Sequence, residues 1–304
     1  MPRAYLVLVA ANLIYSTAPA VARLTLEEVG PATLAFTALV IGSTILVPLA
    51  IARRRAVTPV SAADRWTILW MGLVGFAVAY SLSNWGIRLS TASNAALLIT
   101  LEQACLILLS PMLLGERLTT REGVGALLTL FGALVVVVNG IPGLTVAWAP
   151  RWRGDFLLVA AALAYASYTL LGRRVLSRHS ALPVTAWSVL CGAAGMTPLA
   201  VAEWAGGRGS AWTPAAITGA VYLGAVVTAL GFTAWNYALE RVEAPRAAIF
   251  LNLQPLAGTL LGVWWLGEPL TSFTIAGGLF IVFGLHLAVT AGTSFTRRPA
   301  TMRP

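Results

Sequence analysis

One short motif occurs twice in the chain. Gly115–Thr119 and Gly267–Thr271 both read Gly-Glu-x-Leu-Thr, and they start 152 residues apart in a chain of 304. Self-similarity at a fixed spacing indicates a duplicated structural unit. The architecture of one unit therefore constrains the fold of the whole chain.

The composition predicts a membrane protein. Hydrophobic residues make up 58% of the chain and charged residues 10%, whereas soluble domains carry about 25% charged residues. The net charge of +9 does not indicate nucleic-acid binding, because the arginines stand in short clusters between apolar runs. A lipid bilayer is the expected environment, and no nucleic-acid partner is expected.

Ten apolar segments are each near the ~20 residues that cross a bilayer as a helix. They are residues 4–22, 31–51, 66–87, 92–114, 122–140, 155–172, 183–202, 214–237, 245–266 and 273–291. The expected fold is an all-α integral membrane protein of ten transmembrane helices. A five-helix repeat is expected in 1–140, a linker in 141–154, a second five-helix repeat in 155–291 and a cytoplasmic tail in 292–304.

The first segment also has features of a signal peptide, with Arg3, an apolar run and small residues near Ala20. Against cleavage, residues 10–16 resemble residues 160–166 at an offset of 150. Cleavage would remove a helix that has a partner in the second repeat. The segment is therefore expected to remain as a true span.

The arginines predict the orientation, since basic loop residues favour the cytoplasm. With the N-terminus inside, fifteen arginines are cytoplasmic, and five lie outside, namely Arg23, Arg88, Arg151, Arg153 and Arg208. Both termini are therefore expected in the cytoplasm of a cell whose inner membrane holds the protein.

Five helices per repeat is an odd number, so the two repeats are expected to cross the membrane in opposite directions. Such inverted repeats are common in secondary transporters. The motif agrees: Arg117 lies on the expected cytoplasmic turn, and Pro269 replaces it on the outer turn.

Two five-helix halves, each with a Gly-Glu-x-Leu-Thr turn after its fourth helix, resemble the EamA family of the drug/metabolite transporter superfamily. Residues 251–256 followed by 266–271 are the most typical segment. The first half departs from it, because Gln103 stands where Pro255 stands in the second. A proline-associated weak point is thus expected in the ninth helix and not in the fourth.

The resemblance implies a secondary transporter that exports small metabolites or amino acids through a central cavity lined by helices 1, 3, 4, 6, 8 and 9. Alternating access is the expected mechanism, with proton coupling as one possibility. A passive facilitator or channel of the same fold stays open. An intramembrane lipid-modifying enzyme is disfavoured, because no cluster of His, Asp or Ser nucleophiles is found. No catalytic residue, metal or cofactor is expected, and no phosphate-binding loop indicates a primary pump.

Glu102 is the sharpest site candidate, because it is an acid in the middle of a predicted span. Insertion of an ionised carboxylate there costs at least about 2.5–3.5 kcal/mol, so it should face a cavity or a partner. Two functional interpretations follow: a proton carrier, or a counter-ion for a substrate amine. The structural alternative is a protonated side chain bonded to a neighbouring helix.

Further polar and aromatic side chains on the predicted cavity helices are candidates for binding substrate. They are Gln254, Asn12, Tyr15, Tyr168, Asn84 and Asn236. Gln254 aligns with Glu102 in the repeat, and Asn84 aligns with Asn236. The competing explanations are ordinary hydrogen bonds between membrane helices and the aromatic belt at the interface.

The repeated motif itself is interpreted as structural. Gly115 and Gly267 are expected to end helices in the left-handed conformation, and Thr119 with Glu122 has the spacing of a capping box. Glycines in 122–140 and 273–291 permit close helix approach, so these two helices are expected to be packing elements or the surface of a homodimer. Arg23 and His179 are expected to be solvated.

Overall fold

The computed structural model describes residues 2–53, 61–114, 119–139, 151–176, 178–207, 209–239, 250 and 253–292, and the regular structure in these ranges is helical. The helices are α1 (Pro2–Thr25), α2 (Pro31–Ala52), α3 (Ala62–Gly72), η1 (Leu73–Val78), α4 (Ala79–Leu89), α5 (Ala92–Leu98), α6 (Leu101–Leu114), α7 (Thr120–Val138), α8 (Trp152–Leu176), α9 (Ala181–Ala205), α10 (Pro214–Val221), η2 (Tyr222–Gly231), α11 (Phe232–Leu239), α13 (Leu253–Leu266) and α14 (Ser272–Gly292).

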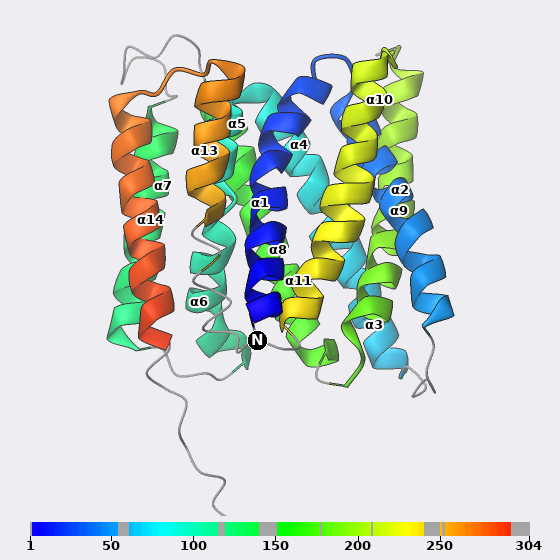
Figure 1. The fold of residues 1–304 in the computed structure, drawn as a ribbon, viewed down its shortest axis with the longest axis horizontal. Helices are drawn as coiled ribbons and strands as arrows, with labels where there is room; N and C mark the ends of the chain where they lie inside the picture. The colour runs from blue at the N-terminus through cyan, green and yellow to red at the C-terminus, as the bar shows by residue number, and fades with distance from the viewer. Residues whose placement is uncertain are drawn as a thin grey trace, which may run out of the picture.

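The helices lie side by side as one bundle (Figure 1). Eight stretches of the described chain are long and apolar enough to cross a membrane, and Ser272–Ala288 of α14 is a shorter apolar helix. The chain is therefore a multi-pass helical protein. Part of the predicted ninth span, 245–249 and 251–252, lies outside the described residues, as do Gly115–Leu118 of the first motif and residues 293–304 of the predicted tail. Below, the end of the bundle where α1 begins is called the N-terminal side, and the opposite end is called the far side.

The fourth predicted span is interrupted between α5 and α6, although Gln103 stands in place of the proline. α5 ends at Leu98 and α6 begins at Leu101, with a turn at Ile99 and Thr100. The Thr100 hydroxyl donates to the Leu97 carbonyl at 2.6 Å, and the Glu102 amide donates to the Ile99 carbonyl at 3.1 Å. These bonds satisfy backbone groups at the break, so no proline is needed to produce it.

Two π-helical segments interrupt long spans at matching positions. η1 covers Leu73–Val78 and η2 covers Tyr222–Gly231, and η1 shifted by 152 residues falls inside η2. Within η2, the Thr228 hydroxyl donates to the Leu223 carbonyl five residues earlier at 2.9 Å. π-Helical turns are rare and are frequently found at functional sites.

The two π-helical spans meet through reciprocal contacts. Phe76 packs on Phe232 with ring centroids 5.4 Å apart, and the Tyr80 hydroxyl lies 3.1 Å from the Thr228 hydroxyl. Residue 76 shifted by 152 is residue 228, and residue 80 shifted by 152 is residue 232. The second contact is therefore the first with the roles of the two chain halves exchanged.

The glycine contacts repeat in the same way. A β-carbon on Gly72 would meet Cys191, and one on Gly224 would meet Ile41. Gly72 and Gly224 are 152 residues apart, and Ile41 and Cys191 are 150 apart, which are the two offsets found in the sequence. α3 therefore meets α9 where η2 meets α2, so each half of the chain packs against the other.

α7 and α14 form a tightly packed pair, as expected from their glycines. A β-carbon on Gly125 would meet the backbone of Gly284 and Ala288, and one on Gly132 would meet the backbone of Gly277 and Ile281. The glycines of the two helices thus face each other within one chain. Outer faces of the pair carry exposed apolar side chains, among them Leu127 and Phe131.

Two predicted helix caps are confirmed, and two further caps are seen in the structure. Thr119 and Glu122 form both bonds of the predicted capping box, and Gly267 has a φ of 64°, as a left-handed cap requires. Ser61 caps α3 and Thr213 caps α10 through their hydroxyls. Their numbers differ by 152, although α3 starts on the N-terminal side and α10 on the far side (Figure 1).

The α7–α14 contact predicts a large difference between two adjacent glycines. A β-carbon on Gly277 would lie 2.6 Å from the Gly132 carbonyl oxygen, which is backbone, whereas one on Gly278 would lie 3.3 Å from the flexible Leu97 side chain. We expect Gly277→Ala to destabilise the protein by about 1–3 kcal/mol through overpacking and Gly278→Ala to change it by less than about 1 kcal/mol. Thermal unfolding in detergent measures both. Equal losses for the two variants would contradict this packing.

Candidate functional site

Six aromatic side chains form one connected cluster inside the bundle. Phe76 of η1 is at its centre and is 1% exposed, with ring centroids of Tyr168, Phe232 and Tyr80 at 5.1, 5.4 and 5.8 Å. Tyr15 packs on Phe232 at 5.9 Å, and Tyr165 packs on Tyr80 at 6.2 Å. The cluster thus joins α1, η1, α4, α8 and α11, and its four tyrosines are half-buried.

Close approach to the π-helical segments depends on two glycines. A β-carbon on Gly75 of η1 would collide with the Tyr168 ring, and one on Gly231 of η2 would lie 2.9 Å from the Tyr15 ring. Each glycine therefore leaves room for one of the two tyrosines that the sequence proposed for the site.

Glu102 is in the first turn of α6, directly after the break in the span. Its carboxylate accepts a hydrogen bond from the Thr169 hydroxyl of α8 at 2.8 Å, and the side chain is half-buried. Thr169 follows Tyr165 and Tyr168 of the cluster on the same helix, α8. Glu102 therefore lies beside the aromatic cluster. Thr169 was not identified from the sequence, although it shares a face of α8 with Tyr165.

Asn12 and Gln254 are brought together, as their assignment to one site requires. The Gln254 side chain donates to the Asn12 side-chain oxygen at 2.8 Å, and the Asn12 amide donates to the Leu8 carbonyl at 2.8 Å. The pair joins α1 to α13. Asn12 is fully buried and Gln254 is half-buried.

The other two predicted site residues, Asn84 and Asn236, lie on α4 and α11. Asn84 is buried and donates to the Pro31 carbonyl at the start of α2, at 3.1 Å. This bond ties α4 to α2. Asn236 lies in α11, and its side chain is outside the described residues.

On the far side, Glu268 of the second motif accepts hydrogen bonds from the start of α5. The donors are the Ala92 amide at 2.7 Å, the Ser93 amide at 2.8 Å and the Ser93 hydroxyl at 2.6 Å. Below this contact, Gly262 of α13 faces Ser93, and Gly258 faces Ala96. The glutamate and the two glycines hold α5 and α13 together, and this contact is called the α5–α13 seam below.

The N-terminal half of the same region is packed differently. α6 continues the span after α5, and it packs on α7, α8 and α14. Among the described residues, α6 has no comparable packing on α1, α11 or α13, whereas α5 packs on both α1 and α13. The residues that precede α13, 240–249 and 251–252, lie outside the described part of the chain, so among the described residues span 4 contacts α13 through α5, on the far side.

Two buried acids on the far side were not identified from the sequence. Asp155 of α8 is 0% exposed and accepts from the Ser90 hydroxyl and from the Asn94 amide at 3.1 Å. Glu203 of α9 accepts from the Thr33 amide at 2.8 Å and the Thr33 hydroxyl at 2.7 Å. Both acids hold the start of another helix, α5 or α2, and both lie near ends of predicted spans, where sequence patterns suggest solvent.

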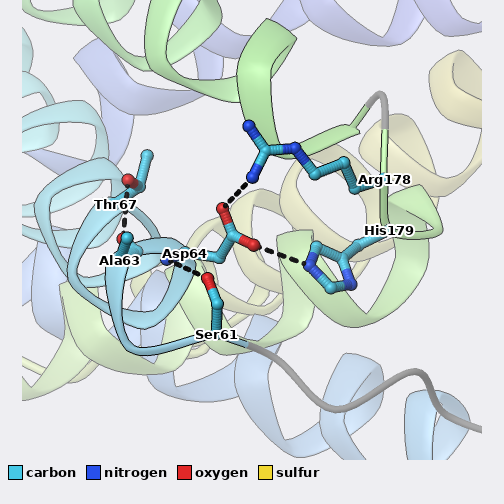
Figure 2. Close-up of polar contacts among 6 residues, drawn as sticks. All are labelled: Ser61, Ala63, Asp64, Thr67, Arg178 and His179. Atoms are coloured by element: carbon cyan, nitrogen blue, oxygen red, sulfur yellow. Dashed lines mark hydrogen bonds and ion pairs between the residues drawn. The ribbon is translucent and has the colours of Figure 1, made fainter.

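On the N-terminal side, His179 is paired, so its interpretation as a solvated side chain is wrong. Asp64 of α3 contacts His179 Nε2 at 3.1 Å and Arg178 at 3.4 Å, and Ser61 caps the helix beside it (Figure 2). The His179 side chain is 12% exposed. The cluster joins α3 to the connection between α8 and α9, which a sequence pattern cannot indicate because the partners are 115 residues apart.

Arg23 is also paired, which corrects a second expectation of solvation. Its guanidinium donates to the Ile87 carbonyl at 2.9 Å and to the Arg88 carbonyl at 2.8 Å. These carbonyls are in the last turn of α4, where a helix lacks internal donors and favours positive charge. Arg23 thus fixes the end of α1 to the end of α4.

Comparison with known proteins places the chain among membrane transporters. The sequence model described as the EamA-like transporter family matches residues 2–138 and again residues 152–290. A "Probable terminal-alkyne amino-acid exporter" of Streptantibioticus cattleyicolor is 30% identical over 291 residues, which cover 94% of this chain and 92% of that protein. A "Probable amino-acid metabolite efflux pump" of Escherichia coli K12 is 26% identical and covers 73% and 74%. One crystal structure shares the fold, with a TM-score of 0.66 at 22% identity, over 98% of this chain and 100% of that one.

The Asp155 contacts predict a loss of stability that depends on the acceptor oxygen. Asp155→Ala leaves the Ser90 hydroxyl and the Asn94 amide without this buried partner, which should cost about 1–3 kcal/mol. Asp155→Asn keeps one acceptor oxygen, so a smaller loss is expected. Unfolding of both variants in detergent measures this, with Glu27→Ala as a control at an exposed acid. A fully stable Asp155→Ala protein would contradict the assignment.

Proposed function

Because the chain belongs to the EamA-like transporter family, we propose that it exports amino acids or related small metabolites by alternating access across a bacterial-type inner membrane. The chain is a small-molecule exporter with several membrane-spanning helices, as its family, relatives and apolar helices show. The substrate type in the proposal is taken from the printed names of the two relatives. The access mechanism is taken from the packing of the described helices.

The proposed architecture is ten helices in two inverted repeats, residues 1–140 and 155–291, with a linker at 141–154 and a tail at 292–304. The reciprocal contacts of Phe76 with Phe232 and of Tyr80 with Thr228 support it, because they exchange under a shift of 152. The caps Ser61 and Thr213 support inversion, since they start helices on opposite sides. The proposed orientation places both termini in the cytoplasm, on the arginine distribution.

The observation that supports alternating access best is the α5–α13 seam. It joins span 4 to α13 on the far side, through Glu268 and through the close approach of Gly258 and Gly262 to α5. In the proposed orientation, the seam closes this region toward the outside. Release outside then requires the seam to separate and the three hydrogen bonds of Glu268 to break.

The proposed substrate region is the space between the aromatic cluster, Glu102 and the Asn12–Gln254 pair. These groups come from both halves of the chain, and the break in span 4 lies next to Glu102. Broken helices near the midplane are typical of substrate and ion sites in inverted-repeat carriers. Asn84 of α4 and Asn236 of α11 are also proposed as neighbours of this region. If transport is coupled to protons, Glu102 is the proposed carrier, and a passive facilitator would show no proton flux.

A homodimer remains a further part of the proposal. The glycines of α7 and α14 pack against each other within the chain. A second copy of the protein would therefore pack on the outer faces of these two helices. These faces carry exposed apolar side chains suited to lipid or protein, namely Val124, Leu127, Phe131, Leu134, Leu279 and Phe283.

Locking the seam tests alternating access. A β-carbon on Gly258 would lie 2.6 Å from the Ala96 β-carbon, within the range that a small shift brings to disulfide geometry. In a background with Cys105 and Cys191 replaced by Ala, we expect oxidised A96C/G258C protein to lose export by at least tenfold, about 1.4 kcal/mol in the barrier, and to recover on reduction. The two single-cysteine variants are controls. Full export by the cross-linked protein would contradict a moving seam.

Proton coupling is tested with Glu102→Gln in proteoliposomes. We expect substrate-driven proton flux to fall to the level of empty vesicles, because an amide does not carry the proton. Substrate movement down its own gradient can persist in the same vesicles. Unchanged proton flux in Glu102→Gln, with unchanged dependence of export on pH, would exclude Glu102 as the carrier.

A further inference from the structure

We propose that the exported solutes carry an amine on an apolar body, with Glu102 as the counter-ion of the ammonium group and the aromatic cluster as the surface for the body. This inference rests on the proposed function, since it assigns a substrate class to the same region. Of the two functional interpretations of Glu102, it selects the counter-ion for a substrate amine. It also assigns the aromatic rings to the apolar body of the same solute.

The position of Glu102 suits pairing with a cation. The residue is in the first turn of α6, beyond the break at Ile99 and Thr100. Partial positive charge at a helix N-terminus stabilises an anion there. One hydrogen bond, from the Thr169 hydroxyl to Oε1, holds the side chain, and the carboxylate remains half-buried rather than enclosed. An ammonium group is the natural partner for such a carboxylate, because a charge-assisted bond offsets part of its desolvation.

The aromatic side chains adjoin this carboxylate. Tyr165, Tyr168 and Thr169 lie within one turn of α8, so the residue that holds Glu102 sits among rings of the cluster. Tyr15 of α1 joins the same cluster through Phe232. Aromatic ring faces carry negative potential and attract cations, and they bury apolar groups at the same time. The surroundings therefore suit a cation with an apolar body.

The distribution of positive charge disfavours anions. Arginines of the described residues stand in first or last turns or in connections, namely Arg3, Arg23, Arg53, Arg65, Arg88, Arg121, Arg151, Arg153, Arg173, Arg174 and Arg178. A carboxylate or phosphate on a solute that lacks an amine would meet Glu102 without a neighbouring described cation. Acetylation of the amine is thus expected to abolish recognition, even where the apolar body is unchanged. The same is expected of a solute that has this body but no amine.

The experiment compares matched solutes that share one phenyl body. Purified protein in proteoliposomes is tested for transport of phenethylamine, phenylalanine, N-acetylphenethylamine and 3-phenylpropionate. We expect the two amines to be transported and to raise the thermal unfolding temperature of the detergent-solubilised protein. We expect at least a tenfold lower apparent affinity for the two solutes that lack an amine.

Two Glu→Gln variants separate a local effect from a general loss of charge. Glu102→Gln should remove the preference for amines, while Glu27→Gln, at an exposed acid of the α1–α2 connection, should keep it. Folding of Glu102→Gln is checked by its unfolding temperature without solute. Tyr168→Leu should weaken binding of both amines several-fold and keep their preference over the acetylated solute.

The outcomes distinguish the inference from the proposed function. Transport of all four solutes at similar rates, or an amine preference that persists in Glu102→Gln, would overturn the amine assignment and leave an exporter. Transport of the non-amine solutes alone would also overturn it. If no tested solute raises the unfolding temperature or is transported, the amine assignment fails for this body. A broader screen of amino acids in the same vesicles then tests the exporter itself.

Discussion

In a bilayer, the amide and carbonyl groups at helix ends and breaks must find partners within the protein, since hydrocarbon offers none. This chain meets the requirement with side chains from distant helices. Glu203 accepts from the start of α2, Glu268 accepts from the start of α5, and Arg23 donates to the end of α4. Because each of these bonds joins a helix end to a remote segment, satisfying the backbone also determines which helices are neighbours.

The second constraint is close approach, and it makes the two halves of the chain interdependent. Helix association in lipid depends on van der Waals packing, which small residues allow at short range. Gly72 accommodates Cys191, Gly224 accommodates Ile41, and the α7–α14 glycines face one another. Neither half can therefore bury these faces alone. The reciprocal contacts of η1 with α11 and of η2 with α4 join the two halves, and their aromatic residues also build the candidate site.

Local patterns predicted the parts of the fold that depend on neighbouring residues. The Thr119–Glu122 capping box, the left-handed Gly267 and the packing of α7 on α14 all follow from short sequence spacings, and the structure confirms them. The bilayer environment and most spans follow from composition and length. For the site, the sequence named Glu102, Tyr15 and Tyr168, which the structure brings to one region, and it named Asn12 and Gln254, which form a bond.

Features that depend on remote partners were missed or misread. His179 and Arg23 were interpreted as solvated, because their partners lie 115 and about 64 residues away. The break in span 4 was not expected, because Thr100 and backbone bonds replace the proline on which the prediction relied. Glu268 was correctly taken as structural, yet its target at the start of α5 has no local signal.

The sequence by itself determined the solvent of this protein, its duplication and its turns, because hydropathy, repetition and capping are properties of neighbouring residues. Tertiary structure alone decided that Glu268 closes the seam to α5, that Thr169 holds Glu102, and that rings from both halves form one cluster. The physical reason is that contacts between helices depend on which faces approach closely. That choice is made by many small residues and buried bonds acting together, across separations of up to 242 residues.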